Sequence, residues 1–296
     1  MLVNKDNFIL GGAQFGNNYG LKKISFNINQ TKFFLKCANK FGFKEFDSAI
    51  DYKVNKKTYT TLIKLGFKIS SKLPYLKNIS LNKINLALRE KVYHYLRCNN
   101  ILTLNILYIH DTSILKNKKK LLIVFNFLEE LKKKKKIKKI GISIYSPRDL
   151  FKIRKMLNNK LPDVVQFPCN VLDKRFCAKK FLTFLKKFKI TPYVRSIFLQ
   201  GLLLLNEKER PNFFLKYRTL LNKWDNHCNY QLDHKISNSV NFIRKQKSFK
   251  NIIIGFDNID NLKLLFKKTV NKKFINFHIK KKIDKALIDP RKWKIK

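Results

Sequence analysis

The feature that most constrains the fold is a regular alternation between short apolar runs and longer stretches with helical periodicity. Such alternation is typical of βα units built around a parallel sheet. Eight runs resemble buried strands, at residues 8–10, 44–47, 68–72, 104–110, 137–143, 164–167, 191–196 and 251–254. Their spacing of about 25 to 40 residues suits a (β/α)8 TIM barrel, so we predict a single domain of the α/β class.

Helical stretches between these runs favour the same architecture. Examples lie at residues 29–41, 81–96, 121–134, 147–157 and 175–187. The main alternative, a Rossmann sheet, needs a phosphate-binding G-x-G-x-x-G loop after its first strand. Residues 11–16 follow the first predicted strand but lack that pattern, and no helix opens directly after them. The sequence therefore indicates a barrel.

Two segments fall outside the βα alternation. Residues 200–229 precede the last strand, and we expect them to form an insertion lying over the functional end of the barrel. Beyond Lys268 the chain is basic and, apart from residues 274–279, without periodicity. We expect a barrel core at about residues 8–268 and a basic C-terminal tail at 269–296 that wraps on the barrel.

The chain is strongly basic, with 65 Lys and Arg against 19 Asp and Glu and a formal net charge of +46. A field of this size attracts nucleic acids and anionic membranes. The lysines are nevertheless spread along the whole chain and accompany abundant Asn, Ile and Phe, which indicates a bias toward A- and T-rich codons. The densest patch, residues 132–139, fits a solvated turn. We therefore expect no specific nucleic-acid partner.

Composition also indicates the environment of the chain. No apolar run reaches the roughly 18 residues of a membrane span, and the N-terminus lacks the layout of a signal peptide. The five cysteines are scattered and form no C-x-x-C pair, so we expect reduced thiols. His227, Cys228 and His234 lie close together, but their spacing is not typical of zinc sites, and we expect no metal. These features predict a cytoplasmic protein without a membrane partner, and they leave its oligomeric state open.

Four chemically useful side chains stand where predicted strands end. Asp47 ends the second run, and Tyr52 follows it closely. Lys72 ends the third run and His110 ends the fourth. Because the carboxyl ends of parallel strands meet at one rim of a β/α barrel, these side chains should converge there. A carboxylate, a phenol, an ammonium and an imidazole form a set suited to acid catalysis.

The set indicates proton donation to a carbonyl oxygen. Tyr52 is the natural donor, but a free phenol has a pKa of about 10 and releases its proton slowly near neutrality. A buried ammonium at Lys72 favours the phenolate, and Asp47 keeps that ammonium charged. His110, as a neutral imidazole, can orient the carbonyl through a hydrogen bond. Such a donor needs a source of hydride, and a nicotinamide is the expected one.

The order of these residues resembles the aldo/keto reductase family over residues 11–265. The matching segments are Asp47-x4-Tyr52, Ser-Lys-Leu-Pro at 71–74, Leu-Tyr-Ile-His at 107–110, Gly-Ile-Ser at 141–143, Val-Gln-Phe-Pro-Cys-Asn at 165–170 and Arg-Ser-Ile-Phe-Leu-Gln-Gly-Leu-Leu at 195–203. The resemblance implies a (β/α)8 barrel that binds NADPH or NADH in extended form and reduces a small-molecule carbonyl substrate, an aldehyde or ketone, to an alcohol. It also implies that Tyr52 is the general acid.

The resemblance further implies which residues hold the cofactor. These residues are Ser143, Gln166, Arg195, Ser196, Leu199, Gly201, Gly255 and Asn261. The first two would bind the nicotinamide carboxamide. Ser196, Leu199 and Gly201 would lie near the pyrophosphate. The loop from Gly255 to Asn261 would hold the adenosine end.

Departures from the family pattern leave alternatives open. The family follows its tyrosine with Gly and then Ser-Glu, whereas Tyr52 is followed by Lys-Val-Asn-Lys. Arg195 stands where the family has a stacking aromatic residue, and its guanidinium could stack or hold an anionic group. Asn261, with Asp257 and Asp260 nearby, stands where a basic residue often grips the NADPH 2′-phosphate. Both NADH and NADPH therefore remain candidates.

Two further segments bear on the substrate. Gln-Phe-Gly-x-x-Tyr-Gly at 14–20 and Arg-Ser-x-Phe-Leu-Gln-Gly at 195–201 resemble a branch of the family associated with sugar metabolism. A sugar-like aldehyde or ketone is therefore the predicted substrate. The altered segment after Tyr52 supports an alternative, a barrel that keeps the fold and a bound nucleotide but serves as a non-catalytic regulatory or interaction subunit.

Overall fold

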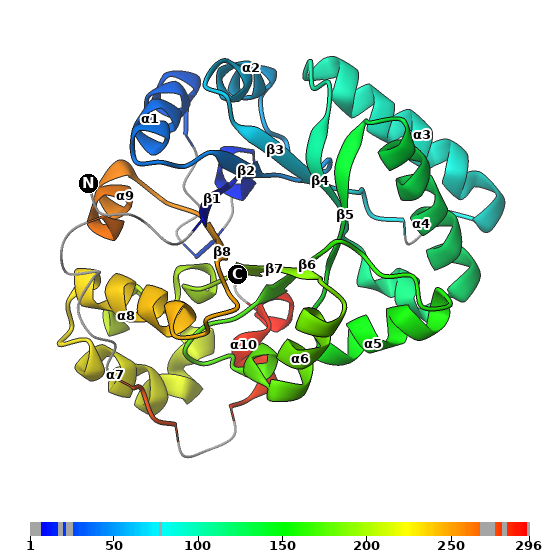
Figure 1. Ribbon diagram of the computed structural model, residues 1–296. Helices are drawn as coiled ribbons and strands as arrows, with labels where there is room; N and C mark the ends of the chain where they lie inside the picture. Colours follow the sequence, from blue (N-terminus) through cyan, green and yellow to red (C-terminus); the bar gives the residue numbers. More distant parts are fainter. Residues whose placement is uncertain are drawn as a thin grey trace.

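Eight parallel strands form a closed barrel with helices around it, which confirms the predicted (β/α)8 fold (Figure 1). The computed structural model describes residues 7–16, 20–21, 26–76, 79–266, 276–279 and 283–294. The strands, in the order in which they pair, are β1 (Asn7–Gly11), β2 (Glu45–Asp47), β3 (Lys68–Lys72), β4 (Leu104–Ile109), β5 (Ile137–Ser143), β6 (Val164–Pro168), β7 (Thr191–Arg195) and β8 (Asn251–Ile254). No strand end differs by more than one residue from its predicted position.

The pairing register brings polar strand ends to one rim. Gly11 of β1 lies opposite Asp47 of β2, and Asp47 lies opposite Ser70 of β3. Farther around the barrel, Ser143 of β5 lies opposite Gln166 of β6. Strand β1 closes the ring by pairing in parallel with β8. The carboxyl ends of all eight strands therefore face the same side of the barrel.

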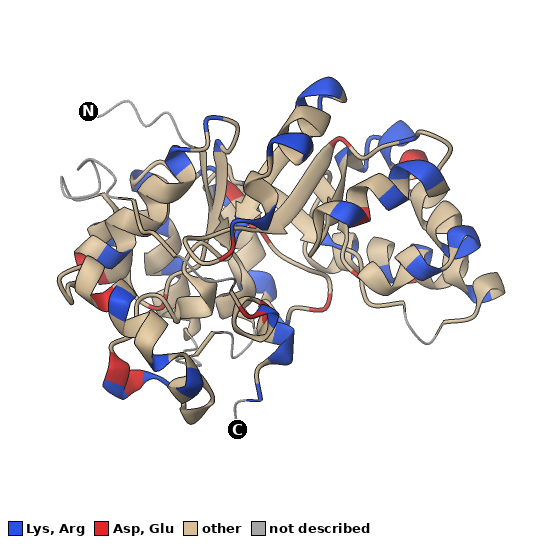
Figure 2. Cartoon of the chain, turned by 90° about the horizontal axis from the view of Figure 1, so that it is seen from below, with Lys and Arg blue, Asp and Glu red and all other residues tan. Residues whose placement is uncertain are grey.

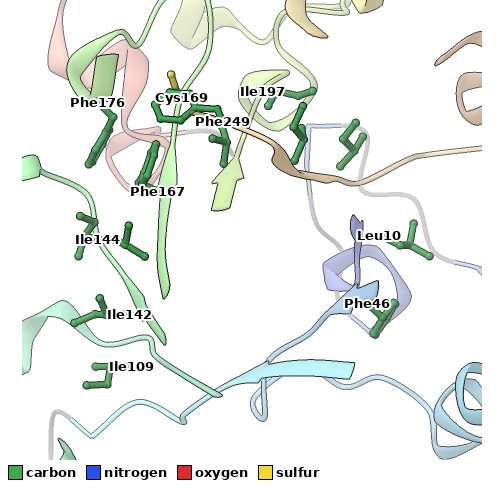
Figure 3. Packing of buried hydrophobic residues seen from close by; sticks show 14 of the residues in the cluster. Leu10, Phe46, Ile109, Ile142, Ile144, Phe167, Cys169, Phe176, Ile197 and Phe249 are labelled. Atoms are coloured by element: carbon green, nitrogen blue, oxygen red, sulfur yellow. The ribbon is translucent and has the colours of Figure 1, made fainter. Parts of the chain in front are cut away.

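Strand side chains alternate between the barrel interior and the surrounding helices, because successive side chains of a strand point to opposite faces. The interior cluster consists of Ile9, Ile106, Tyr108, Val164, Tyr193 and Ile253. Side chains of the outer cluster that are labelled in Figure 3 include Leu10, Phe46, Ile109, Ile142 and Phe167. Gly141 of β5 leaves space for the ring of Tyr108 in the interior, since a Cβ added there would lie 2.3 Å from Cδ1 of Tyr108.

The helices surround the barrel, as Figure 1 shows. Those in the described residues are α1 (Ile28–Lys40), α2 (Lys56–Lys64), α3 (Leu81–Cys98), α4 (Lys118–Lys133), α5 (Pro147–Met156), α6 (Lys179–Lys187), α7 (Arg218–His227), α8 (Leu232–Arg244), α9 (Ile259–Leu265) and α10 (Lys285–Ile288). Side-chain caps fix where several of them begin. Asn27 caps α1 and Ser146 caps α5, each in a capping box with the residue three positions later.

The structure contains helices besides those named from the sequence, and it divides one of those named; the additional helices are α2, α7, α8, α9 and α10. The start of α2 is set by Asn55, whose side chain accepts a hydrogen bond from the backbone N–H of Lys57. The helix predicted at 175–187 is interrupted. A 3-10 turn, η3 (Arg175–Cys177), ends at Ala178, which has an extended conformation, and α6 begins one residue later.

The segment predicted to lie over the barrel, residues 200–229, reaches the rim only at its beginning. It folds into 3-10 turns and α7, and these lie beside α8 (Figure 1). A buried ion cluster holds this part of the chain. Both Nη2 of Arg210, at 2.7 Å, and Nζ of Lys235 in α8, at 2.8 Å, contact the Asp225 carboxylate. The insertion is therefore mainly a side wall and only in part a cover.

The C-terminal residues depart from the predicted basic tail without periodicity. Residues 283–294 contain α10 and a 3-10 turn, η8 (Pro290–Lys292), and Leu287 and Ile288 are buried. Phe277 packs against the indole of Trp224 and against His227. His227 is thus a packing residue, and within the described ranges no three His, Cys, Asp or Glu side chains gather as a metal site. Tail residues 269–275, which include Phe274, and residues 280–282, 295 and 296 lie outside the described residues.

Basic residues are distributed over the whole molecule. Figure 2 shows Lys and Arg on helices throughout the chain, with few Asp and Glu among them. This distribution agrees with the expectation that the positive charge does not mark one arm or one helix. None of the described helices combines the length and the apolar character that a membrane span requires.

Candidate active site

A cavity of about 430 Å³ opens at the carboxyl ends of the strands. All four residues predicted for acid catalysis line it, namely Asp47, Tyr52, Lys72 and His110. They come from the ends of β2, β3 and β4 and from the loop after β2. The topology of the barrel therefore brings together side chains that are far apart in the sequence.

Lys72 and Asp47 form a buried ion pair at the floor of the cavity. Nζ of Lys72 lies 2.5 Å from Oδ2 of Asp47, and the two residues are 3% and 6% exposed. The same ammonium donates to the backbone oxygen of Ser48 at 2.9 Å. The second carboxylate oxygen of Asp47 accepts a hydrogen bond of 3.1 Å from Nε2 of Gln166. Both charges are thus held in fixed positions, as a buried pair requires.

Tyr52 lies next to this ion pair. Nζ of Lys72 is 5.7 Å from the centre of the Tyr52 ring, within the range of an attractive cation–ring contact. Burial lowers the pKa of Lys72 from its usual value, and the negative charge of Asp47 opposes that shift. A positive charge placed beside a phenol lowers the free energy of its ionised form. The structure therefore places the Lys72 ammonium beside the Tyr52 ring at the cavity.

His110 is present as a neutral imidazole. Burial lowers its pKa to about 3, and the positive charges of Lys72 and Arg195 add to the effect. Its ring lies against that of Tyr75, with 5.0 Å between the ring centres. Its Nδ1 is buried and has no hydrogen-bond partner within the described residues. A neutral ring in this position can donate one hydrogen bond to a carbonyl oxygen.

This low pKa has a measurable consequence for stability. The unfolded chain binds a proton at His110 near pH 6.5, whereas the folded protein binds it only near its folded pKa of about 3. Between these values the unfolded state holds more protons, so the free energy of unfolding should decrease as the pH falls. We expect His110→Gln to flatten this part of the profile, as measured by urea unfolding at several pH values. An identical slope in the variant would show that His110 titrates normally.

Seven of the eight residues predicted to bind the cofactor also line the cavity. They are Ser143, Gln166, Arg195, Ser196, Gly201, Gly255 and Asn261. Leu199 does not; its side chain is fully buried in the hydrophobic core beneath the loop. Gly201 has a φ of +93°, which a side chain rarely allows, and thereby lets the loop turn at the cavity wall.

The loop after β8 forms the opposite wall. A Cβ at Gly255 would lie 2.2 Å from Oε1 of Gln14, so the Gln14 side chain packs directly against this glycine. Gln14 in turn donates a hydrogen bond of 3.1 Å to Asp257. Asn261 lies in the first turn of α9, and its N–H donates to the capping side chain of Asn258. These contacts keep this wall close to β1.

Comparison with known proteins decides the family. The aldo/keto reductase family model matches residues 7–268. The chain belongs to the aldo/keto reductase family. This family consists of oxidoreductases that use nicotinamide cofactors, and the match covers every strand of the barrel.

Solved structures support the fold of this aldo/keto reductase. An aldo-keto reductase from Bacillus halodurans in its holo form has a TM-score of 0.65 at 15% identity and covers 91% of this chain and 88% of its own. The glycerol dehydrogenase from Gluconobacter oxydans gives 0.63 at 17% identity, with 88% and 86% covered. A putative aldo-keto reductase from Pseudomonas aeruginosa gives 0.62 at 15% identity, with 90% of each chain covered. A search of curated proteins finds no match.

The cavity of this aldo/keto reductase also includes residues that the sequence did not predict for the site, and three of them are charged or aromatic residues or their neighbours. Tyr145 follows β5, and Pro290 and Arg291 come from the C-terminal turn η8. No periodicity in the sequence predicts that residues 290–291 lie at the barrel rim. The Pro-Arg pair after the Asp289 cap is the one local signal, since Pro at the first position of a turn and Asp before it fix a helix-like start.

Proposed function

We propose that this aldo/keto reductase reduces a small aldehyde or ketone to the alcohol with NADPH or NADH, and that Tyr52 is the general acid. The observation that carries the proposal is the buried Lys72 ammonium, held by Asp47 and facing the Tyr52 ring inside one cavity. A sugar-like substrate agrees with the motifs at 14–20 and 195–201.

The residues at the centre of the cavity suit a nicotinamide. Nε2 of Gln166 donates to Asp47, because a carboxylate can only accept, and this fixes the orientation of the Gln166 amide. Its Oε1 is consequently left buried and without a partner in the described residues. An amide N–H of a nicotinamide carboxamide would satisfy this oxygen, with Ser143 beside it on the same wall. The bound nicotinamide supplies the hydride.

The protein's own groups control the proton. Tyr52 gives its hydroxyl proton to the oxygen of the carbonyl substrate, and Lys72 stabilises the phenolate that remains. Asp47 keeps Lys72 charged and in place through the ion pair. His110 donates a hydrogen bond that orients the carbonyl oxygen, and its low pKa keeps it neutral during the step.

Nucleotide binding tests the cofactor assignment. We expect NADPH or NADH to quench the emission of Trp224 and Trp293 in the wild-type protein at micromolar concentrations. Gln166→Leu should weaken that binding about tenfold, because a hydrogen bond to the carboxamide is lost. Gln231→Leu, at an exposed site before α8, is the matched control and should bind normally. Failure of both nucleotides to bind wild type would refute the assignment.

A further inference from the structure

Arg195 stands at the wall of the cavity and has no acidic partner among the residues that the structure describes. It ends β7 and lines the cavity together with the proposed catalytic residues. Burial is the main cause of the lowered pKa values of His110 and Lys72, and the positive charge of Arg195 contributes to both. Its Nη1 donates only a long hydrogen bond, 3.4 Å, to Oγ of Ser196. Its Nη2 is buried with no hydrogen-bond partner in the described part of the chain. An unsatisfied guanidinium nitrogen costs free energy unless a ligand supplies an acceptor.

A second guanidinium reaches the same wall from the C-terminal turn. Cζ of Arg291 lies 3.5 Å from the centre of the Tyr145 ring, and Cζ of Arg195 lies 4.5 Å from it. Asp289 holds Arg291 through two hydrogen bonds, of 2.8 and 2.7 Å. One aromatic ring thus positions two cations that would otherwise repel each other.

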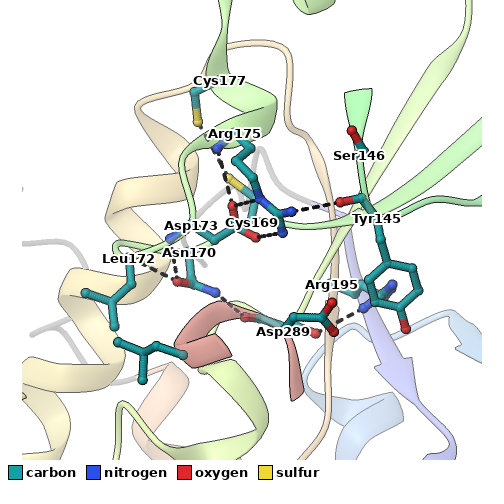
Figure 4. A network of polar contacts seen from close by, with 12 residues as sticks. Tyr145, Ser146, Cys169, Asn170, Leu172, Asp173, Arg175, Cys177, Arg195 and Asp289 are labelled. Carbon is teal, nitrogen blue, oxygen red and sulfur yellow. Dashed lines mark hydrogen bonds and ion pairs between the residues drawn. The ribbon is translucent and has the colours of Figure 1, made fainter. Parts of the chain in front are cut away.

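The loop that carries Tyr145 is itself fixed. Figure 4 shows the network that joins the ends of β5, β6 and β7. Nη1 of Arg175 donates to the backbone oxygen of Tyr145 at 3.0 Å, and the same side chain is bound by Asp173, whose carboxylate is fully buried. Nδ2 of Asn170 donates to the backbone oxygen of Ser196 at 3.1 Å. The two guanidinium groups therefore stand on a preorganised support.

The acidic residues of the cavity are engaged elsewhere. Asp47 pairs with Lys72, and Asp257 accepts a hydrogen bond from Gln14. Asp51 is exposed and accepts a hydrogen bond from the backbone N–H of Tyr75. No carboxylate of the described residues forms an ion pair with Arg195, so its charge remains uncompensated.

We propose that Arg195 and Arg291 form a binding site for an oxyanion group, carboxylate or phosphate, of the carbonyl substrate. The substrate class is then an aldehyde or ketone that carries an acid group, such as an aldehyde acid or a sugar phosphate. This inference rests on the proposed reductase function for the identity of the reacting group. A planar guanidinium binds carboxylate and phosphate oxygens in two-point contacts, which gives both affinity and orientation.

The binding arm of the test needs no turnover. Succinate and inorganic phosphate are titrated into the protein and binding is measured by calorimetry. We expect saturable binding to wild type and at least about a tenfold weaker affinity in Arg195→Gln and in Arg291→Gln, since a charge-assisted hydrogen bond is lost in each. Arg148→Gln, exposed on α5 and outside the cavity, is the control for loss of one positive charge. Equal affinity in all four proteins, or no binding to wild type, would overturn the proposal.

The kinetic arm separates substrate from cofactor. Succinic semialdehyde and butanal differ in the acid group, so the wild-type KM should be at least about tenfold lower for the acid. Arg195→Gln and Arg291→Gln should each abolish this preference, and in Arg291→Gln the Kd for NADPH should stay within about twofold. A large loss of NADPH affinity with an unchanged preference would show that the cation serves the nucleotide instead. If wild type turns over neither aldehyde, the reductase function fails, and the binding arm alone still decides whether the anion site exists.

Discussion

Tyr52→Phe should lower kcat for aldehyde reduction by about a hundredfold to ten-thousandfold, which is the usual contribution of a positioned general acid. The change removes one oxygen atom and leaves the ring that faces Lys72, so the fold and the affinity for the nicotinamide nucleotide should be retained. Steady-state kinetics and a fluorescence titration of the same preparation measure both quantities. Loss of turnover with unchanged binding is the signature of a proton donor.

The matched control is a tyrosine outside the cavity. Tyr230 is 62% exposed, and Tyr230→Phe removes the same hydroxyl group from the surface. Its turnover should equal that of wild type. If Tyr52→Phe also turned over at the wild-type rate, another group would have to supply the proton, and the assignment of Tyr52 would be wrong.

Lys72→Met should reduce turnover at least as strongly, by about a hundredfold or more, because the phenolate of Tyr52 loses the charge that stabilises it. Methionine has a similar length and no charge, so the cavity keeps its shape. The effect should fall on kcat, with nucleotide affinity nearly unchanged. Lys68→Met, at the exposed start of the same strand, is the matched control and should retain full activity.

Removal of Lys72 also leaves the buried Asp47 carboxylate without its ion-pair partner. A buried carboxylate without a partner costs free energy, so Lys72→Met should be less stable than wild type at neutral pH, as measured by urea unfolding. The double variant Lys72→Met with Asp47→Asn should recover stability at neutral pH and remain inactive, which separates catalytic loss from misfolding.

The strands could be predicted almost to the residue, because most of them contain a short, largely buried apolar run. Leu104–Ile109 and Asn251–Ile254 are examples. Helix α2 has a weak sequence signal, because it is short and its apolar residues are few. The start of α6 was misplaced because the 3-10 turn at Arg175–Cys177 carries the same spacing of residues as a helix; only the extended Ala178 separates the two.

The site could be predicted where it depends on strand ends, as for Asp47 and Lys72, because the barrel topology requires these positions to converge. The contribution of Arg291 could not be predicted from the sequence. Its place at the cavity depends on the packing of Leu287 and Ile288 against the rest of the protein, a tertiary contact without a sequence period, and the local pair with Asp289 then orients its side chain. The burial of Leu199 likewise depends on its left-handed backbone, with φ of 49°, which turns the side chain into the core.

The most direct test of the reductase function is single-turnover oxidation of bound NADPH or NADH, followed by loss of the reduced-nicotinamide signal when aldehydes and aldoses are mixed with the protein. Both neutral and acidic members, including succinic semialdehyde, belong in the panel. We expect rapid oxidation of the bound nucleotide in wild type and at most background rates in Tyr52→Phe and Lys72→Met. If wild type binds the nucleotide but oxidises it no faster than either variant across the panel, the chain is a nucleotide-binding subunit and not a reductase.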